Sequence, residues 1–193
     1  LMAWAKAGST TLGSAGDNVT VSSLPDQKIF SVLATTIAPA AGSTQQSLQF
    51  NGDTGSNYGR RYSTDGGSDS SSTSTRISTG SGTAANSMAF TVGYVVNVAG
   101  EEALAISHGV DTYTAGAGNA PTRMEAVGKW ATTTAINRID IFNPTSEDFQ
   151  IGSNSSILGS DGVESMTVQD GTIFYETDNN KSYVLNGSTW TEL

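Results

Sequence analysis

Strict alternation of large apolar and smaller residues over residues 87–98 is the feature that most constrains this chain. The large residues at every second position are Met88, Phe90, Val92, Tyr94, Val96 and Val98. The positions between them hold Ala89, Thr91, Gly93, Val95 and Asn97. Because successive side chains of a strand point to opposite faces of a sheet, this period predicts a β-strand. We expect the large-residue face to lie between two sheets.

The rest of the chain is suited to short strands and polar turns. Of its 193 residues, 22 are glycine, and only 14% of residues are charged. Long helices need Leu, Glu, Lys, Gln and Arg at helical spacing, and this pattern is missing. Further strands are expected at residues 19–21, 29–36, 47–50, 103–110, 123–130, 136–143 and 151–158.

About eight strands with almost no helix predict an all-β fold. We expect an antiparallel two-sheet sandwich of jelly-roll type over residues 1–160. A generic Greek-key sandwich is the alternative, and the lack of a fixed-period repeat disfavours a parallel β-helix. Residues 63–87 are nearly all Ser, Thr, Gly, Asp and Ala. That composition favours a loop or a Ser/Thr-rich edge strand over a functional binding loop.

The end of the chain carries three short strand-like runs, at residues 172–176, 182–185 and 189–192. Residues 177–181 form the first turn between them. The second contains Asn186-Gly187, the dipeptide that best accepts the positive φ of a tight hairpin turn. We therefore expect residues 161–193 to form a C-terminal β-meander appended to the sandwich.

Two segments resemble parts of viral proteins. Residues 170–193, DGTIFYETDNNKSYVLNGSTWTEL, resemble a terminal segment of tailed-virus virion proteins of head and tail. Residues 50–58, FNGDTGSNY, resemble an FNxDxGxNY signature of β-sandwiches in viral structural proteins. The resemblance implies a virion structural protein of a phage or an archaeal virus.

Such a protein would be non-enzymatic and would lie on the virion exterior, as a capsid decoration, turret, spike or tail component. Its partners would be copies of itself, in a homo-oligomer of cyclic symmetry, and other virion proteins. Sheet edges and the terminal meander are the expected contacts, since symmetric contacts bury edge strands. The protein would be assembled in the host cytoplasm and located in the virion; an extracellular location is the alternative.

The net charge and the distribution of apolar residues disfavour nucleic acid and membranes as partners. The net charge of −9 disfavours binding to nucleic acid, which requires clustered Lys and Arg. No apolar run approaches the roughly 18–20 residues of a membrane span, and the first residues do not resemble a signal peptide. The chain has no cysteine, so disulfides and thiolate metal sites are excluded.

We expect no catalytic residues and no cofactor. His108 is the single histidine and lies in an alternating run, so a strand face explains it better than a catalytic triad. Glu101 and Glu102 are best explained as a solvated turn. An enzyme such as a glycan hydrolase or lyase is the least favoured reading.

Calcium is the one metal worth considering. Asn51, Asp53 and Asn57 place oxygen-bearing side chains in one short loop, and Asp178 lies in a second oxygen-rich turn. Neither loop has the spacing of an EF-hand. Ordinary turn chemistry, in which Asn and Asp side chains bond to nearby backbone, is the favoured explanation.

The alternative function is a carbohydrate- or receptor-binding module, lectin-like or adhesin-like, with a host-surface glycan as its ligand. Aromatic side chains on β-sheets can stack on sugars. The candidates are Trp4, Trp130, Trp190, Tyr58, Tyr62 and Tyr113. Of these, Trp130 is expected in the core, and Trp190 is expected to pack on the meander or on a neighbouring subunit.

Overall fold

The computed structural model describes residues 4–112, 114–161, 170–178, 180–187 and 189–193. These residues fall into two compact units, one within Trp4–Gly162 and the other within Val163–Leu193. Throughout the described residues the regular structure is β-strand, and every strand pairing is antiparallel. The prediction of an all-β, antiparallel fold is confirmed. None of the described residues forms a helix long and apolar enough to cross a membrane.

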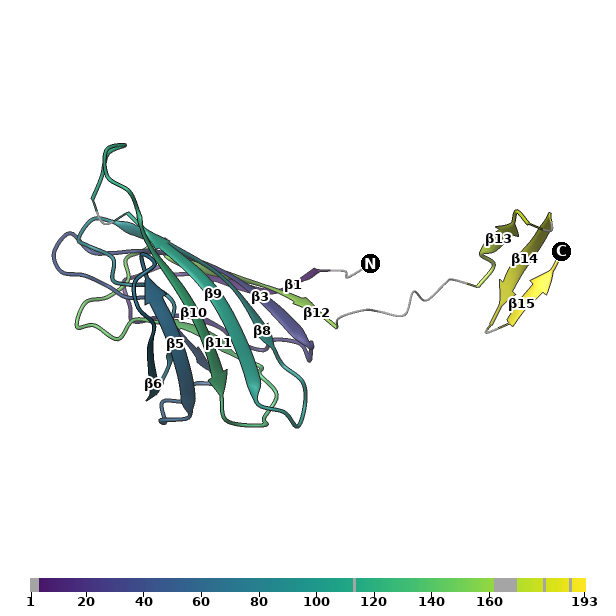
Figure 1. Ribbon diagram of the computed structural model, residues 1–193, viewed down its shortest axis with the longest axis horizontal. Coiled ribbons are helices and arrows are strands. Elements are labelled where there is room, and N and C mark those ends of the chain that lie inside the picture. Colours follow the sequence, from purple (N-terminus) through teal and green to yellow (C-terminus); the bar gives the residue numbers. More distant parts are fainter. Residues whose placement is uncertain (1–3, 113, 162–169, 179, 188) are drawn as a thin grey trace. The chain divides into compact units, whose positions relative to one another are not determined.

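The first unit contains a large sheet of eight strands (Figure 1). In spatial order they are β1 (Ala5–Thr11), β12 (Asn154–Ser160), β3 (Ile29–Ile37), β8 (Met88–Val96), β9 (Ala103–Asp111), β10 (Thr122–Trp130), β5 (Tyr58–Thr64) and β6 (Ser70–Ser74). A smaller sheet of four strands packs against one face of the large sheet. Its order is β2 (Asn18–Val21), β11 (Ile139–Phe142), β4 (Ser47–Phe50) and β7 (Ile77–Ser78).

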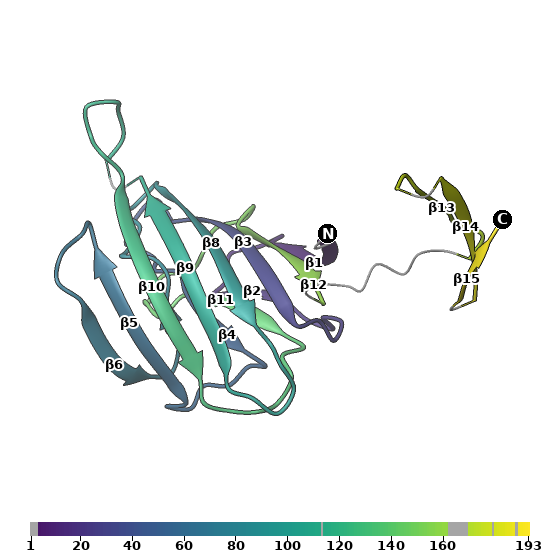
Figure 2. The same cartoon turned by 45° about the vertical axis from the view of Figure 1, so that its right-hand side comes forward.

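The hydrophobic core fills the space between these two sheets. The small sheet contributes Val19, Leu48 and Ile141, and the large sheet contributes Phe30 and Val32, all fully buried. Figure 2 shows β2, β4 and β11 behind the strands of the large sheet. The two layers therefore form a sandwich, as expected from alternating strands that each bury one face.

The winding of the chain bears on the jelly-roll prediction. Setting aside β5, β6, β9 and β10, the sheet orders are β1-β12-β3-β8 and β2-β11-β4-β7. Within this frame the chain crosses to the other sheet at every connection except the one from β4 to β7. A jelly roll, which is built from two Greek keys, winds in this manner. The jelly-roll type stays a prediction that the strand order supports, and the four extra strands widen the larger sheet.

The large-residue face of β8 points away from the small sheet. Phe90 and Tyr94 are 41% and 46% exposed, whereas Ala89, Thr91 and Val95 are at most 2% exposed. The prediction that the large-residue face lies between the sheets is therefore wrong. The period of β8 was read correctly, but its two faces were assigned the wrong way round.

Close approach of the two layers explains why the inner face of β8 and β9 carries mainly small residues and why β10 has a glycine at position 128. A Cβ atom on Gly109 of β9 would overlap the backbone carbonyl oxygen of Thr79, which follows β7. A Cβ atom on Gly128 of β10 would lie 2.6 Å from the Ile77 side chain. Large residues do not fit at these two positions. Most large residues of β8 and β9 point outward, whereas β10 buries Met124 and Trp130 on either side of Gly128.

A buried polar link also fixes which face of β8 is internal. Gln46, just before β4, is 1% exposed, and its Nε2 donates to the Thr36 hydroxyl at 2.7 Å and to the Ala89 carbonyl at 3.2 Å. The Thr91 hydroxyl donates to Gln46 Oε1. Thr91 therefore has a partner between the sheets, and burial of its hydroxyl carries little penalty.

Most strands match their predicted positions. The predictions at residues 29–36, 47–50, 103–110 and 123–130 agree with β3, β4, β9 and β10 to within one residue at each end. β1, β5 and β7 were not predicted, because their sequences offer little apolar alternation. β6 is the outermost strand of the large sheet, so the edge-strand alternative holds for that part of residues 63–87.

The second unit is the predicted three-stranded meander, formed by β13 (Ile173–Glu176), β14 (Lys181–Asn186) and β15 (Thr189–Glu192). Phe174 faces Tyr183 across the first pair of strands, and Gly187 has the positive φ of 64° expected in the second turn. The Phe174 ring lies 6.4 Å from the Tyr183 ring and 6.1 Å from the Trp190 ring. One face of the meander is thus aromatic.

Two phenylalanines on paired strands test the corrected orientation. Phe30→Ala should cost about 3–5 kcal/mol of folding free energy, the usual range for a buried Phe. Phe90→Ala, which removes a side chain that is 41% exposed, should cost the monomeric fold about 1 kcal/mol. Urea unfolding of both variants measures the difference. Equal losses would contradict the outward orientation of Phe90.

Substitution of Gly109 tests the close approach of the layers. Gly109→Ala should destabilise the protein by about 3 kcal/mol or more, because the neighbour it would displace is backbone. Gly13→Ala is the matched control, since nothing lies within 4 Å of its added Cβ. Thermal unfolding followed by circular dichroism compares the two. A Gly109→Ala variant as stable as Gly13→Ala would refute the tight contact.

Candidate interaction surface

The outer face of the large sheet, opposite the small sheet, carries many exposed apolar residues. Eight of them are 40–54% exposed: Met88, Phe90, Tyr94, Val96, Leu104, Ile106, Val110 and Val127. We call this set the apolar stripe. Isolated exposed apolar residues are normal on proteins, but a contiguous set of this size marks an interaction surface.

The register of the strands makes the stripe continuous. Phe90 lies opposite Val110, Tyr94 opposite Ile106, and Val96 opposite Leu104 on the paired strands β8 and β9. Ile106 in turn lies opposite Val127 of β10. Directly opposed residues on one face of a sheet have Cβ atoms about 5 Å apart, so these side chains are in contact range.

Further apolar residues flank the stripe on its β3 side. Leu33 of β3 pairs with Val92, and both side chains are half-buried on the outer face. The Trp4 ring, just before β1, lies 6.1 Å from the Tyr94 ring and is itself 38% exposed. Tyr94 therefore sits between an indole and the aliphatic residues of β9.

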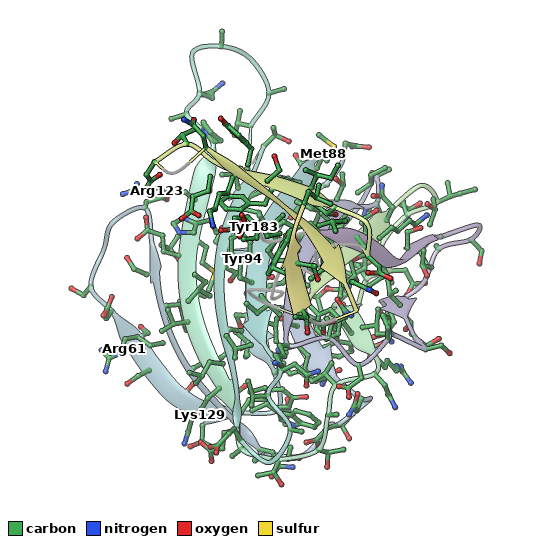
Figure 3. All side chains as sticks on the ribbon, turned by 90° about the vertical axis from the view of Figure 1, so that its right-hand side faces the viewer. Arg61, Met88, Tyr94, Arg123, Lys129 and Tyr183 are labelled. Carbon is green, nitrogen blue, oxygen red and sulfur yellow. The ribbon has the colours of Figure 1, made fainter. Side chains whose placement is uncertain are left out.

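The opposite flank, on β10 and β5, carries paired charges. The ion pairs are Arg61–Asp69 at 3.3 Å, Arg123–Glu125 at 3.7 Å and Lys129–Glu102 at 2.7 Å. Figure 3 shows Arg61, Arg123 and Lys129 toward the β10 and β5 side of the sheet, away from Met88 and Tyr94. These pairs join three cations to three anions, so they add no net charge to the flank, although the chain carries a net charge of −9.

His108 is part of this surface. It lies on the outer face of β9, with Val92 and Glu125 as its neighbours on the adjacent strands. A shallow depression is lined in part by His108, Glu125 and Ile106. Glu102 precedes β9 and pairs with Lys129; at about 3.3 Å per residue it lies about 20 Å along the strand from His108. The structure therefore does not bring the Glu102 carboxylate and the His108 imidazole together.

The candidate calcium loop is held together by its own hydrogen bonds. Asp53 Oδ2 accepts from Trp130 Nε1 at 2.7 Å and from Asn57 Nδ2 at 2.9 Å, and its Oδ1 accepts from the Gly55 N–H at 2.8 Å. Asn51 Oδ1 accepts from the backbone N–H groups of residues 137 and 138. The Gly55 bond is the local turn chemistry that the sequence favoured, whereas the bonds to Trp130 and to residues 137 and 138 join the loop to distant parts of the chain.

Asp178 lies in the exposed turn between β13 and β14. In the same turn, Asn180 Oδ1 accepts a hydrogen bond from the Tyr175 hydroxyl at 2.8 Å. Within the described parts of the chain, no three His, Cys, Asp or Glu side chains gather as a metal-binding group would require.

The aromatic candidates for sugar binding divide into core and surface residues. Tyr58 and Trp130 are buried, with their rings 6.4 Å apart, and both pack against Phe50. Burial raises the pKa of Tyr58 to about 12. Trp130 is a core residue, as expected. Trp190 packs on Phe174 and remains 42% exposed.

Two other aromatic candidates complete this comparison. Tyr62 lies beneath the Arg60 guanidinium, whose Cζ is 5.4 Å from the ring centroid. Tyr113 lies outside the described residues.

Comparison of the chain with protein families, curated proteins and solved structures finds no significant match. The surface therefore has to be interpreted from its own residues. Sequence reasoning missed it because alternation defines two faces and does not say which is internal. The inner positions of β9 hold Ala103, Ala105, Ser107 and Gly109. Such a run of small residues could have indicated a closely approached inner face.

The Asp53 carboxylate provides a test of the turn. Burial acts to raise its pKa, but hydrogen bonds from Trp130, Asn57 and Gly55 outweigh this and lower the pKa below the usual 3.8. A carboxyl whose pKa is lower in the folded state stabilises the fold above pH 3.8, and the contribution is lost as pH falls below that value.

We expect Asp53→Asn to lose about 1–3 kcal/mol at pH 7, because one hydrogen-bonded oxygen becomes an amide donor. Since Asn does not titrate, the difference from the wild type should shrink as pH falls below 3.8. Urea unfolding at a series of pH values measures it, with the exposed Asp26→Asn as control. A difference that does not depend on pH would exclude the charged Asp53 as the stabilising form.

Proposed function

We propose that this protein is a non-enzymatic structural component of the exterior of a virus particle, and that it acts by assembling with copies of itself and with neighbouring virion proteins. The single observation that carries the proposal is the apolar stripe. Eight large side chains, each about half exposed, cover three adjacent strands of a well-packed sheet. A contiguous apolar patch of this size is often functional, and contact with a partner is a usual function of such patches.

The meander supports the same proposal. Three strands of four to six residues bury too little area to be stable alone. Phe174 and Tyr175 are each 52% exposed and Ile173 is 65% exposed. The meander therefore needs a further surface to pack on, and neighbouring proteins of a particle would supply one. The resemblance of residues 170–193 to virion proteins agrees with this role.

The outer face also changes which surface we propose as the contact between copies. The sequence predicted contacts through the sheet edges. The large sheet ends in β6, of sequence SSSTS, an exposed and polar edge strand. Its broad face, which is apolar, is better suited to burial than this edge.

Immunogold labelling tests the proposed function. Antibodies raised against the purified chain should decorate the outside of particles released by host cells that carry its gene. The protein should also copurify with those particles through a density gradient. Antigen found only in the soluble fraction, with unlabelled particles, would overturn the proposal.

A carbohydrate-binding module is the second candidate, and one observation favours it. Phe174, Tyr183, Trp190 and Glu176 line a shallow pocket on the meander, which combines stacking rings with a carboxylate. Glycan-array binding that is lost in Trp190→Ala but kept in Trp4→Ala would support this candidate.

A further inference from the structure

We infer that the outer face of the large sheet is a self-association interface, in which the apolar stripe of one copy packs on the same stripe of a second copy. The inference deepens the proposed function, because it names the contact through which copies would assemble. The sequence predicted contacts through the sheet edges, whereas this inference assigns the contact to the face of the large sheet. The observations that support it all lie on that outer face.

The size of the stripe fits the apolar centre of one interface. Aromatic side chains bury about 150–250 Å² and aliphatic ones less, so eight residues at 40–54% exposure present on the order of several hundred Å². The largest apolar patch of a typical monomer covers about 300–600 Å² and is often functional. Each partner contributes roughly 800 Å² to a standard interface, so polar residues around the stripe would supply the rest.

The charge distribution favours a copy of the same chain over a charged partner. A partner that binds through its charge would need unpaired charges of the opposite sign at the rim of this surface. On the β10 and β5 flank, three cations are instead joined to three anions in ion pairs. Two acidic copies repel each other through a net charge of −9, and a neutral face is where they can approach most closely.

The geometry of a sheet face is also compatible with a twofold contact. A twofold interface requires the same patch on both copies. Sheet faces pack about 10 Å apart when their twists match, and two copies of one sheet have the same twist. The centre of the stripe is the Tyr94–Ile106 pair, with Val127 beyond it. These side chains would interdigitate as the inner faces of a sandwich do.

Analytical ultracentrifugation of the full chain tests the inference. The wild type should form an oligomer at micromolar concentration. Ile106→Glu, at the centre of the stripe, should reduce its mass by a factor of two or more and weaken self-association at least tenfold. Ile151→Glu makes the same change at a residue that is 63% exposed but lies outside the sheet, so it should leave the oligomer intact.

A second measurement does not depend on disrupting the interface. Because the chain has no cysteine, Ile106→Cys can carry a single pyrene label. Labels on facing stripes should give excimer fluorescence that disappears on dilution, whereas pyrene on Ile151→Cys should not. Circular dichroism confirms that each variant is folded.

Three outcomes would overturn the inference: a monomeric wild type, an Ile106→Glu variant that keeps the wild-type mass, or no excimer from Ile106→Cys within an intact oligomer. Either of the last two outcomes would show that copies associate through another surface. The stripe would then bind a different partner. A failure of the self-association test would not affect the immunogold labelling of particles. Unlabelled particles would not change the masses measured by ultracentrifugation. The two proposals can therefore fail separately.

Discussion

The close approach of the two sheets near β7 is the constraint on which the rest of the structure depends. The backbone at Thr79 and the side chain of Ile77 leave no room for a side chain at Gly109 or Gly128. The positions of β8 and β9 that face this region must therefore hold small residues, whereas β10 buries Met124 and Trp130 on either side of Gly128. Since β8 and β9 still alternate, most of their large residues lie on the outer face. One steric condition inside the sandwich thus produces an apolar surface outside it.

The sequence predicted the strands well and their orientation poorly. Alternation placed β3, β4, β8, β9 and β10, because a period of two is a local property of the chain. Which face is buried depends on what packs against it, and that information lies in distant residues such as Thr79 and Gln46. Hydrophobic content alone assigned Phe90 to the core, and the close approach of the layers overrides that preference.

The candidate site was predictable only in part. The loop at Asp53 was interpreted as turn chemistry, and its bond from the Gly55 N–H agrees with that interpretation, but the bond from the distant Trp130 indole was not foreseen. His108 was assigned to a strand face, and it lies on the outer face of β9. The stripe that surrounds it could not be recognised, because its members come from three strands whose register is set by pairing. A surface formed by neighbouring strands becomes visible only when the sheet order is known.

Hydroxyl-radical footprinting with mass spectrometry tests the central claim, that the large sheet turns its large residues outward. The protein is labelled at a concentration low enough to dissociate any oligomer. We expect rapid oxidation of Met88 and Tyr94, which are 49% and 46% exposed, and protection of the buried Tyr58 and Phe30. Protection of Met88 and Tyr94 in the dissociated monomer would instead show that this face is internal.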